Sequence, residues 1–347
     1  MPTVSGYNRQ PSVTSIALIT GGSTPERNVA LAGAGEVAAA LRHKAYAVVV
    51  IDTYHGVLDA AQEATILDSS VGLEPPDEEE LESIAAAEDL VATVRLEEVR
   101  ASDLVFLVLH GRQGEGGLVQ ALLEAEGIAF VGSDSGASFL AMDKDVSKRL
   151  LRAAGVATPD WEMWPADGAA IDSLGLPLVV KPSRVGSTVG LTIVYRRQDV
   201  QAAVELALRY DSEVLLERFV DGREITIGVL GDEPLAVGEI LPENEVFDYE
   251  CKYTPGMCEE VFPAPIDDSL ASRARELALV AHRTLKLRDL SRVDFRIDGH
   301  GELWCLEVNT LPGVTSTSLL PQSGAAAGVP FAELCDRVCE LALRRSS

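Results

Sequence analysis

The first 133 residues alternate between short apolar runs and longer mixed segments. Mainly apolar runs occur at 15–20, 46–52 and 104–109. Such runs are typical of parallel strands covered on both faces. An alanine-rich stretch with helical spacing lies between the first two, and a further helix is predicted at 118–127. The order strand, helix, strand predicts a parallel α/β domain that ends near residue 133.

The pattern changes after residue 133. One helix is predicted at 136–155, and two strands flank a glycine- and serine-rich loop at 177–194. Apolar runs at 223–231 and 234–242 predict an antiparallel pair with a turn between them. Further elements are expected as a helix at 199–210, a strand at 213–220, an amphipathic helix at 269–287 and a closing helix at 331–345. This part of the chain is therefore expected to be α+β.

The strands predicted at 290–298 and 302–310 carry polar side chains on one face. Alternation places Arg292 and Asp294 on the same side of the first strand. In the second strand alternation separates two sets, Cys305, Glu307, Asn309 and Trp304, Leu306, Val308. If the strands pair, Asp294, Glu307 and Asn309 converge beside Arg292. Two carboxylates and an amide oxygen suit Mg²⁺, which commonly also holds substrate phosphates.

The formal net charge of −25 argues against negatively charged binding partners. An acidic surface repels nucleic acid and anionic membranes, so neither is expected to bind. No apolar run reaches the ~18 residues that cross a bilayer. Of six lysines, three lie inside polar segments discussed below: Lys144, Lys181 and Lys252. A local basic pocket within an acidic shell is the expected result.

Two further features predict little chemistry. Among five cysteines there is no CxxC pair, and no histidine lies near Cys335 and Cys339 to complete a zinc site. Free thiols fit a reducing cytoplasm. Residues 53–102 give no clear pattern, and the acidic run at 73–82 is expected to be a solvated loop or the start of a helix. Residues 1–14 are expected to form a disordered leader, since they lack the apolar core of a signal peptide.

The loop at 181–190 is a candidate phosphate site. Its glycines let backbone N–H groups approach a phosphate, and Lys181 stands at the end of an apolar strand. The loop matches neither the Walker A pattern nor GxGxxG. An ordinary hairpin connection is the alternative. A polar loop between apolar strands favours a lid that closes over a reactive phosphate.

Two more segments follow strands of the first domain. The turn at 21–28 opens a helix at the carboxyl edge of the sheet, where ligands bind in α/β folds. It places Glu26 there, and helix capping by Ser23 or Thr24 is the plain alternative. His110 ends another strand at the same edge, while Glu115 beyond it is expected at the surface.

The second half of the chain adds three weaker signals. The strand and loop at 213–224 could contact a nucleotide through Glu217, Val220 and Glu224, although an edge strand with a solvated acidic face is the alternative. The loop at 248–256, which contains Lys252 and Tyr253, is either a second lid or a surface turn. In the segment at 309–321, Gly313 could offer an N–H to an oxyanion and Ser318 could bind a carboxylate.

Eight segments, taken in this order, resemble the D-alanine–D-alanine ligase family of the ATP-grasp superfamily: GGSTPERN, LHGRQGEGG, MDKDVSK, KPSRVGSTVG, ERFVDGRE, YECKYTPG, SRVDFRID and LEVNTLPGVTSTS. The resemblance runs from about residue 15 to the end of the chain, with 53–102 unmatched. It implies a Rossmann-like domain at 15–133, a central ATP-binding subdomain at 134–220 and a C-terminal subdomain at 221–347. The two α+β subdomains would clamp ATP between antiparallel sheets.

The resemblance also implies a reaction. ATP would phosphorylate the carboxylate of one D-alanine, and the amine of a second D-alanine would attack the acylphosphate through a tetrahedral intermediate. The products would be D-alanyl-D-alanine for peptidoglycan synthesis, ADP and phosphate. ATP and two Mg²⁺ ions, replaceable by Mn²⁺, are the implied cofactors. A cytoplasmic homodimer is the implied form of the protein.

Roles carry over from the resemblance onto matching positions. The metal ligands would be Asp294, Glu307 and Asn309. The nucleotide site would be formed by Lys144, Lys181, Glu217, Arg218, Val220, Glu224 and Lys252. The two amino acids would be held by Glu26, His110, Arg292, Gly313, Ser318 and Leu319, with Arg292 and the Gly313 N–H on the oxyanion. A hydrogen-bonded triad that ties the lids to the site would consist of Glu26, Ser187 and Tyr253.

Other readings stay open at this point. A related ligase could use D-serine, D-lactate or another amino acid as acceptor, although Tyr253 favours a dipeptide product. The chain departs from the usual family pattern at Asn28, Gly116 and Val185, which affects lid contacts and substrate affinity. A different class of function is also open, namely a protein with the same fold that binds a nucleotide without catalysis. The intact Arg292 argues against this, because binding alone would not need an arginine for the oxyanion.

Overall fold

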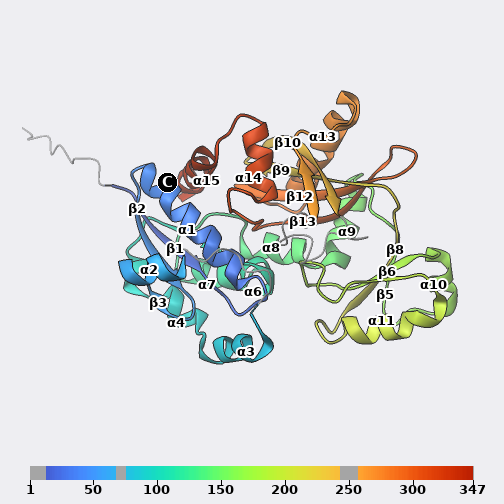
Figure 1. Cartoon of the computed structure of the whole chain (residues 1–347), viewed down its shortest axis with the longest axis horizontal. Coiled ribbons are helices and arrows are strands. Elements are labelled where there is room, and N and C mark those ends of the chain that lie inside the picture. Colours follow the sequence, from blue (N-terminus) through green and yellow to red (C-terminus); the bar gives the residue numbers. More distant parts are fainter. Residues whose placement is uncertain (1–12, 68–75, 243–256, 347) are drawn as a thin grey trace, which may run out of the picture.

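The computed structural model describes residues 13–67, 76–242 and 257–346. The expected leader lies outside these residues except for Val13 and Thr14, and so do Lys252 and Tyr253. Figure 1 shows three sheets, one in the N-terminal part, one in the central part and one in the C-terminal part. Within the described residues no helix combines the length and apolar content needed to cross a membrane.

The N-terminal sheet has the strand order β3-β2-β1-β4. Strands β1 (Ser15–Thr20), β2 (Ala47–Asp52) and β4 (Leu104–Val108) are parallel, and the short β3 (Gly56–Val57) is antiparallel to β2. This arrangement confirms the predicted parallel α/β layer. The surrounding helices are α1 (Arg27–His43), α2 (Ala60–Ile66), α3 (Glu78–Ala87), α4 (Leu90–Val94), α5 (Glu97–Arg100), α6 (Gly111–Glu115) and α7 (Leu118–Ala125).

Both faces of this sheet are covered, as its apolar strands require. On one face Ile16 and Leu18 pack against α1 and against the closing helix α15 (Phe331–Ser346). On the other face Ala17 and Ile19 pack with Val119 of α7. The last helix of the chain therefore completes the core of the first sheet, and Figure 1 shows α15 beside α1 and β2.

The central part begins with two helices where the sequence pattern predicts one. Helix α8 (Ser135–Met142) ends at Asp143, which is extended, and α9 (Lys144–Ala153) begins directly after it. The Asp143 carboxylate accepts a hydrogen bond from Val146 N at 3.1 Å and so caps α9. The expectation of a single helix at 136–155 is wrong because an aspartate cap competes with helix continuation. The break places Lys144 in the first turn of α9.

The central sheet is antiparallel throughout, with the order β5-β8-β6-β7. Its strands are β5 (Trp161–Met163), β6 (Leu178–Pro182), β7 (Thr192–Val194) and β8 (Val214–Arg218). Helices α10 (Gly168–Leu174) and α11 (Val200–Ala207), with the 3-10 turn η1 (Arg197–Asp199), cover one face and enclose a core around Leu178 and Leu216. The opposite face carries Val179 and Lys181, which line a cavity described below.

The C-terminal sheet has the order β11-β10-β9-β12-β13, again antiparallel. Its strands are β9 (Arg223–Leu230), β10 (Glu233–Pro242), β11 (Cys258–Val261), β12 (Leu290–Ile297) and β13 (Leu303–Asn309). The predicted turn between β9 and β10 is confirmed, since Leu230 pairs with Glu233. Helix α13 (Asp268–Thr284) buries its alanines against Ile227 and Phe295 on one face, and α14 (Leu319–Ala326) packs near the other.

A β-bulge in β13 changes which side chains share a face. Asp294 pairs with Glu307, but the next residue, Phe295, pairs with Cys305, so Leu306 is an extra residue. Cys305 and Val308 therefore both lie in the core with Phe295. The strict alternation expected for this strand is wrong N-terminal to Glu307. The bulge turns both Leu306 and Glu307 toward the open side of the sheet.

Candidate active site

The open face of β12 and β13 holds the expected cluster of oxygen ligands. Arg292 lies opposite Asn309, and Asp294 lies opposite Glu307. Asn309 Nδ2 donates a hydrogen bond to Asp294 Oδ2 at 3.0 Å, and Thr226 Oγ1 donates to Asp294 Oδ1 at 2.7 Å. The Asp294 carboxylate is buried. Pairing of the two strands thus brings together the three side chains that sequence periodicity predicts to converge.

The charge of Arg292 is firmly held at this cluster. Its guanidinium lies 2.8 Å from Asp294 Oδ2. Burial by itself would lower the pKa of Arg292, but the carboxylates of Asp294, Glu307 and Glu115 outweigh burial and raise that pKa above its ordinary value. A permanently charged guanidinium beside two carboxylates leaves the cluster able to bind both a cation and an anionic group.

The ligand types at this cluster fit a hard divalent cation. In the described residues, no group of three His, Cys, Asp or Glu side chains could hold a metal ion without other ligands. A cation here would use the Asp294 and Glu307 carboxylates, the Asn309 amide oxygen and oxygens of a bound phosphate. Mg²⁺ in proteins is commonly bound by only a few protein ligands, and substrate phosphate supplies others.

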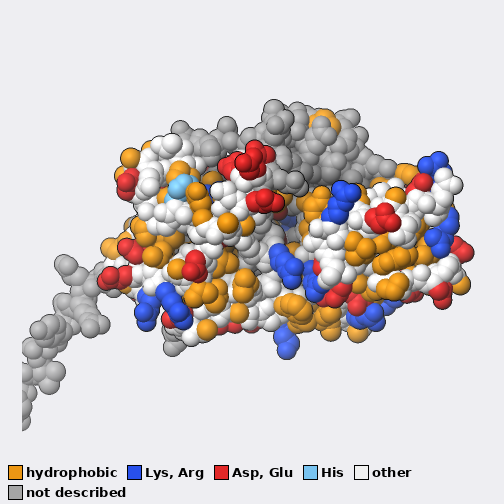
Figure 2. Space-filling model, turned by 90° about the horizontal axis from the view of Figure 1, so that it is seen from below, with side chains coloured by type: hydrophobic (Ala, Val, Ile, Leu, Met, Phe, Trp, Pro, Cys, Tyr) orange, Lys and Arg blue, Asp and Glu red, His pale blue; other side chains and the backbone are white. Residues whose placement is uncertain are grey.

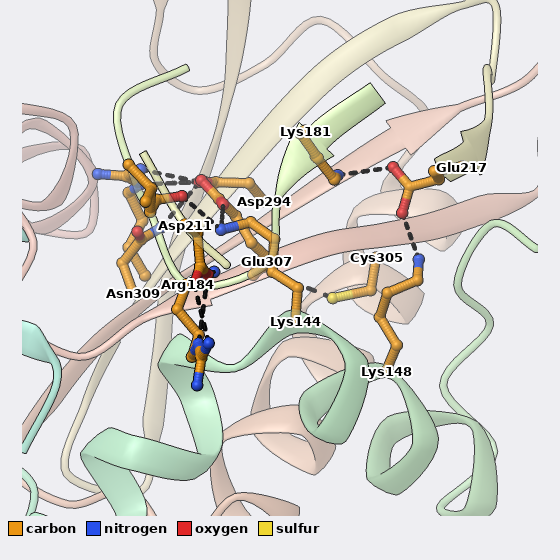
Figure 3. Close-up of polar contacts among 12 residues, drawn as sticks. Lys144, Lys148, Lys181, Arg184, Asp211, Glu217, Asp294, Cys305, Glu307 and Asn309 are labelled. Carbon is orange, nitrogen blue, oxygen red and sulfur yellow. Dashed lines mark hydrogen bonds and ion pairs between the residues drawn. The ribbon is translucent and has the colours of Figure 1, made fainter. Parts of the chain in front are cut away.

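Two lysines flank a buried glutamate next to this cluster, and a third lysine lies beside Glu307 (Figure 3). Lys181 Nζ lies 2.7 Å from Glu217 Oε1, and Lys148 Nζ lies 2.5 Å from Glu217 Oε2. Lys144 Nζ donates to Val185 O at 2.8 Å and lies 3.5 Å from Glu307 Oε2. Glu217 is 2% exposed, and its strand β8 lies between β5 and β6. The edge-strand alternative for this segment is therefore wrong.

A narrow cavity of about 120 Å³ lies between the central and C-terminal sheets. The central sheet contributes Val179 and Lys181, and the C-terminal sheet contributes Asp294 and Arg296. Six of the seven residues expected at the nucleotide line it: Lys144, Lys181, Glu217, Arg218, Val220 and Glu224. The seventh, Lys252, lies outside the described residues. Figure 2 shows Lys and Arg side chains at the hollow between the N-terminal and central parts, and others spread across the same face.

A second, larger cavity of about 1110 Å³ adjoins the first. The two share Gly186, Arg292 and Glu307 in their linings, so they meet at the oxygen-ligand cluster. The larger cavity is lined by all the described residues that the resemblance assigns to the amino acids and the triad: Glu26, His110, Ser187, Arg292, Gly313, Ser318 and Leu319. Tyr253 lies outside the described residues.

Local backbone geometry explains how Glu26 reaches this cavity. Gly21 has a φ of +98°, and a Cβ there would lie 2.2 Å from Asp52 Oδ1. The turn at 21–26 can therefore pass directly over the buried Arg27–Asp52 ion pair of 2.6 Å. Helix α1 begins at Arg27 with Glu26 at its N-cap, and the Glu26 side chain does not cap the helix. The alternative that Ser23 or Thr24 caps this helix is wrong, because the N-cap residue is Glu26 and the Ser23 hydroxyl donates to Glu88.

Glu88, from the region 53–102 that has no clear sequence pattern, stabilises the turn at 21–26. Glu88, between α3 and α4, accepts hydrogen bonds from the Ser23 hydroxyl and from Gln113 Nε2. Gln113 in turn accepts a hydrogen bond from Ser23 N at 3.0 Å. The network ties the turn that carries Glu26 to the helix α6 that carries Glu115. The α3–α4 region therefore supports the part of the larger cavity that Glu26 and Glu115 line.

Glu115 is a cavity residue rather than the surface residue expected from the sequence. It lines the larger cavity and accepts a hydrogen bond from Gly111 N at 3.0 Å. Burial, with a smaller contribution from the nearby Glu26 carboxylate, raises the pKa of Glu115 to about 8. The side chain turns inward because α6 is only one short turn, which folds the LHGRQGEGG segment back on itself.

Protonation of Glu115 predicts a pH-dependent stability. Its pKa is raised from 4.5 to about 8, so the folded protein binds more protons than the unfolded chain between these values. The favourable contribution is complete below pH 4.5 and is lost as pH rises toward 8. We expect Glu115→Gln to be more stable than the wild type at pH 8, by on the order of 4 kcal/mol, with the difference falling to about 1 kcal/mol at pH 5. Urea unfolding at both pH values measures this difference.

The exposed glutamate Glu98 on α5 provides the control. Glu98→Gln removes the same charge from the surface and should leave the pH dependence of the wild type unchanged. Equal unfolding free energies for Glu115→Gln and the wild type at pH 8 would contradict the buried, protonated state of Glu115.

Gly313 and Ser318 pack closely at another part of the larger cavity. A Cβ at Gly313 would lie 2.8 Å from Ser318 Oγ. That hydroxyl accepts a hydrogen bond from Thr315 N at 3.2 Å and lies 2.6 Å from Thr315 Oγ1. Ser318 is also the N-cap of α14 and makes no side-chain cap bond, and Leu319 begins the helix. The hydroxyl therefore lies on the cavity side of the helix N-terminus.

The loop between β6 and β7 reaches both cavities. Val185 and Thr188 line the smaller cavity, whereas Ser187 lines the larger one. Ser187 and Thr188 have φ values of 54° and 61°, in the left-handed region. Arg184 anchors the start of the loop through a 2.8 Å ion pair with Asp211. This geometry supports the lid interpretation over an ordinary hairpin connection.

Comparison with known proteins supports one family. The description "D-ala D-ala ligase N-terminus" matches residues 15–133, and "D-ala D-ala ligase C-terminus" matches residues 150–340. The chain is 38% identical over 339 residues to the D-alanine–D-alanine ligase of Syntrophobacter fumaroxidans, covering 95% of this chain and 97% of the relative. It is 43% identical over 267 residues to that of a Synechococcus strain, covering 75% and 82%.

Solved structures agree with the sequence relatives. The D-alanine–D-alanine ligase of Bacillus anthracis complexed with ATP has a TM-score of 0.77 and 30% identity, covering 96% of this chain and 99% of that one. The VanG D-Ala:D-Ser ligase of Enterococcus faecalis has a TM-score of 0.76 and 30% identity, covering 95% and 99%. The chain belongs to the D-alanine–D-alanine ligase family and has its ATP-grasp fold.

Proposed function

We propose that the two adjoining cavities bind ATP and two D-alanines, and that the residues named above carry out the ligation. The activity is that of a D-alanine–D-alanine ligase, an enzyme that supplies a peptidoglycan precursor. The observation that supports the site assignment most strongly is the junction at Arg292 and Glu307, where the nucleotide cavity meets the substrate cavity. A phosphate and a carboxylate held in the two cavities would meet there.

ATP would lie in the smaller cavity with its phosphates toward this junction. Lys144 and Lys181 would contact the phosphates, together with Lys252. Both oxygens of Glu217 already bind lysines, so the adenine would be read mainly by backbone groups near Arg218 and Val220. Glu224, which lies 3.1 Å from Arg296 Nη2, would accept from the ribose.

Asp294, Glu307 and Asn309 would hold Mg²⁺, with Mn²⁺ as a substitute. When bound, the ions would offset the negative charge of the phosphates and allow the carboxylate to approach. Arg292, paired with Asp294, keeps a cation at the same point.

Glu26 would bind the ammonium group of the first D-alanine, with His110 near its carboxylate. A carboxylate oxygen would attack the γ-phosphorus of ATP, giving an acylphosphate and ADP. Ser187 and Tyr253, with Glu26, would hold the two lids closed and exclude water from this intermediate. Water exclusion matters because an acylphosphate hydrolyses readily.

Ser318 and the backbone at Leu319 would bind the carboxylate of the second D-alanine. Its amine, after losing a proton, would attack the acylphosphate carbon to form a tetrahedral intermediate. Arg292 and the Gly313 N–H would stabilise the oxyanion. Collapse would break the carbon–oxygen bond to phosphate and form the peptide.

The acylphosphate step has a direct test. With D-alanine labelled with ¹⁸O in its carboxylate, the carbon–oxygen cleavage transfers one labelled oxygen to inorganic phosphate. Mass spectrometry of the phosphate should find one ¹⁸O for each dipeptide formed. Unlabelled phosphate would exclude an acylphosphate intermediate.

Substitution of Gly313 tests the acceptor site. The added Cβ of Gly313→Ala would push Ser318 Oγ from its place. We expect the KM of the second D-alanine to rise about tenfold while the KM for ATP stays near that of the wild type. Steady-state kinetics measures both constants. Gly299→Ala, where a Cβ would meet nothing within 4 Å, is the control. A larger rise for ATP than for D-alanine would contradict the assignment.

Two expectations remain to be tested. The similarity to a D-Ala:D-Ser ligase favours one alternative acceptor. An assay in which D-alanine competes with D-serine or D-lactate, with the products identified by mass, would show which acceptor is preferred. The expected major product is D-alanyl-D-alanine. A cytoplasmic homodimer stays a prediction. Analytical ultracentrifugation of the purified protein would test whether it is a dimer.

A further inference from the structure

Lys148 is a buried charge that the reaction scheme above does not use. It lies one helical turn after Lys144 on α9, and its side chain is 2% exposed. Its ammonium group lies 2.5 Å from Glu217 Oε2 and 2.6 Å from Thr158 Oγ1, and it stands 4.9 Å from the centre of the Trp161 ring. Such a charge is costly to bury unless it has a specific partner.

Lys148 and Lys181 divide the Glu217 carboxylate between them. Each ammonium group binds a different oxygen, and Figure 3 shows the two lysines approaching from different sides. Lys181 and Glu217 line the nucleotide cavity, but Lys148 does not. The three groups carry one net positive charge, and only Lys181 can present it to a ligand.

We propose that Lys148 is a positioning residue for ATP, acting through Glu217 on Lys181. By occupying one carboxylate oxygen, Lys148 offsets the charge of Glu217 and fixes its orientation. Lys181 is then held at the cavity wall without being fully neutralised, so its charge stays available to a phosphate. Without Lys148, Lys181 would be the sole counterion of a buried carboxylate and would be kept from the nucleotide. This role rests on the proposed contact between Lys181 and ATP.

The electrostatics of the three groups agree with this role. Burial would raise the pKa of Glu217, yet Lys148 and Lys181 together lower it, so the carboxylate remains ionised. Burial lowers the pKa of Lys148 to about 8, against the opposing effect of Glu217, so the ammonium form predominates at neutral pH. A lysine that served packing alone would need neither the charge nor the carboxylate.

The test compares Lys148→Met with Arg152→Met. Arg152 lies on the same helix and over the same Trp161 ring at 4.5 Å, but its ion pair is with Asp160. We expect Lys148→Met to raise the Kd and KM for ATP about tenfold and to leave the KM for D-alanine within twofold of the wild type. Arg152→Met should leave all three constants within twofold. Isothermal titration with ATP and steady-state kinetics supply the values.

A double variant separates positioning from folding. In Lys148→Met/Glu217→Gln the buried carboxylate is removed with its partner, so the fold is expected to tolerate the change. Lys181 is then no longer held by an unbalanced carboxylate, and ATP affinity should recover at least threefold relative to Lys148→Met. If Lys148→Met does not fold, a Kd for ATP within threefold of the wild type in the double variant supports the proposal, and a weaker Kd overturns it.

The remaining outcomes are equally decisive. An unchanged ATP affinity in folded Lys148→Met, or equal losses for ATP and D-alanine, would overturn the positioning role. A wild-type protein that failed to bind ATP or to form dipeptide would instead refute the proposed site, which is a separate result.

Discussion

Replacing Asp294 with asparagine is expected to lower the rate of dipeptide formation by on the order of a thousandfold or more. The change preserves the shape of a buried side chain that accepts from Thr226 and Asn309, but it removes the charge. Without that charge the cluster loses affinity for a divalent cation, and the phosphates of ATP would no longer be offset where the carboxylate attacks. The same result is expected for Glu307→Gln.

The measurement has two parts. Turnover at saturating ATP and D-alanine gives the rate, and electron paramagnetic resonance of Mn²⁺ in the presence of ADP gives metal binding directly. Asp232→Asn, at the exposed turn between β9 and β10 of the same sheet, is the matched control and should behave as wild type. Wild-type rates and Mn²⁺ affinity in both Asp294→Asn and Glu307→Gln would refute the metal assignment.

Removing the Arg292 guanidinium is the second change with a large expected effect. Arg292→Met should lower kcat by about a hundredfold to a thousandfold, because it deletes a donor to the tetrahedral oxyanion. Arg292→Lys should recover only part of the loss, since a single ammonium cannot reproduce the forked contact that Arg292 makes with Asp294. ADP and dipeptide are measured in samples quenched at successive times, and their rate of formation at saturating substrates gives kcat for each variant.

Arg296, four residues further along β12, makes the comparison specific. It pairs with Glu224 on the nucleotide side and lies over the Phe219 ring. Arg296→Met should raise the KM for ATP and leave kcat at saturating ATP close to wild type. A fall in kcat for Arg296→Met as large as for Arg292→Met would contradict a specific oxyanion role for Arg292.

Sequence periodicity predicted the oxygen-ligand cluster because side chains two residues apart share a face of a strand. It failed at Cys305, because a bulge has no regular signal in the hydrophobic pattern. The single helix expected at 136–155 failed for a similar reason. Its apolar spacing is continuous, but Asp143 prefers a capping position to a helical one.

Two charged residues of the site were missed for a different reason. Glu115 and Lys148 are placed by tertiary structure, and for Glu115 nothing in the neighbouring sequence indicates that the side chain faces a cavity. For Lys148 there was a usable signal, since it lies four residues after Lys144 and must share a helix face with it. Glu88 could not have been found this way, because its partners Ser23 and Gln113 are distant in sequence.

The resemblance supplied what local physics could not. Periodicity predicted a metal and a phosphate near Asp294, but not the substrate that the phosphate would activate. The larger cavity, which Glu26, His110 and Ser318 line, is where the substrate would bind, because it meets the smaller cavity at Arg292.

Product stoichiometry tests the central claim most directly. The purified chain is incubated with ATP, Mg²⁺ and D-alanine, and ADP, phosphate and D-alanyl-D-alanine are counted in the same sample. The account predicts equal amounts of all three, with no ADP when D-alanine is omitted. ADP formed without D-alanine, or no D-alanyl-D-alanine at saturating substrate, would contradict it.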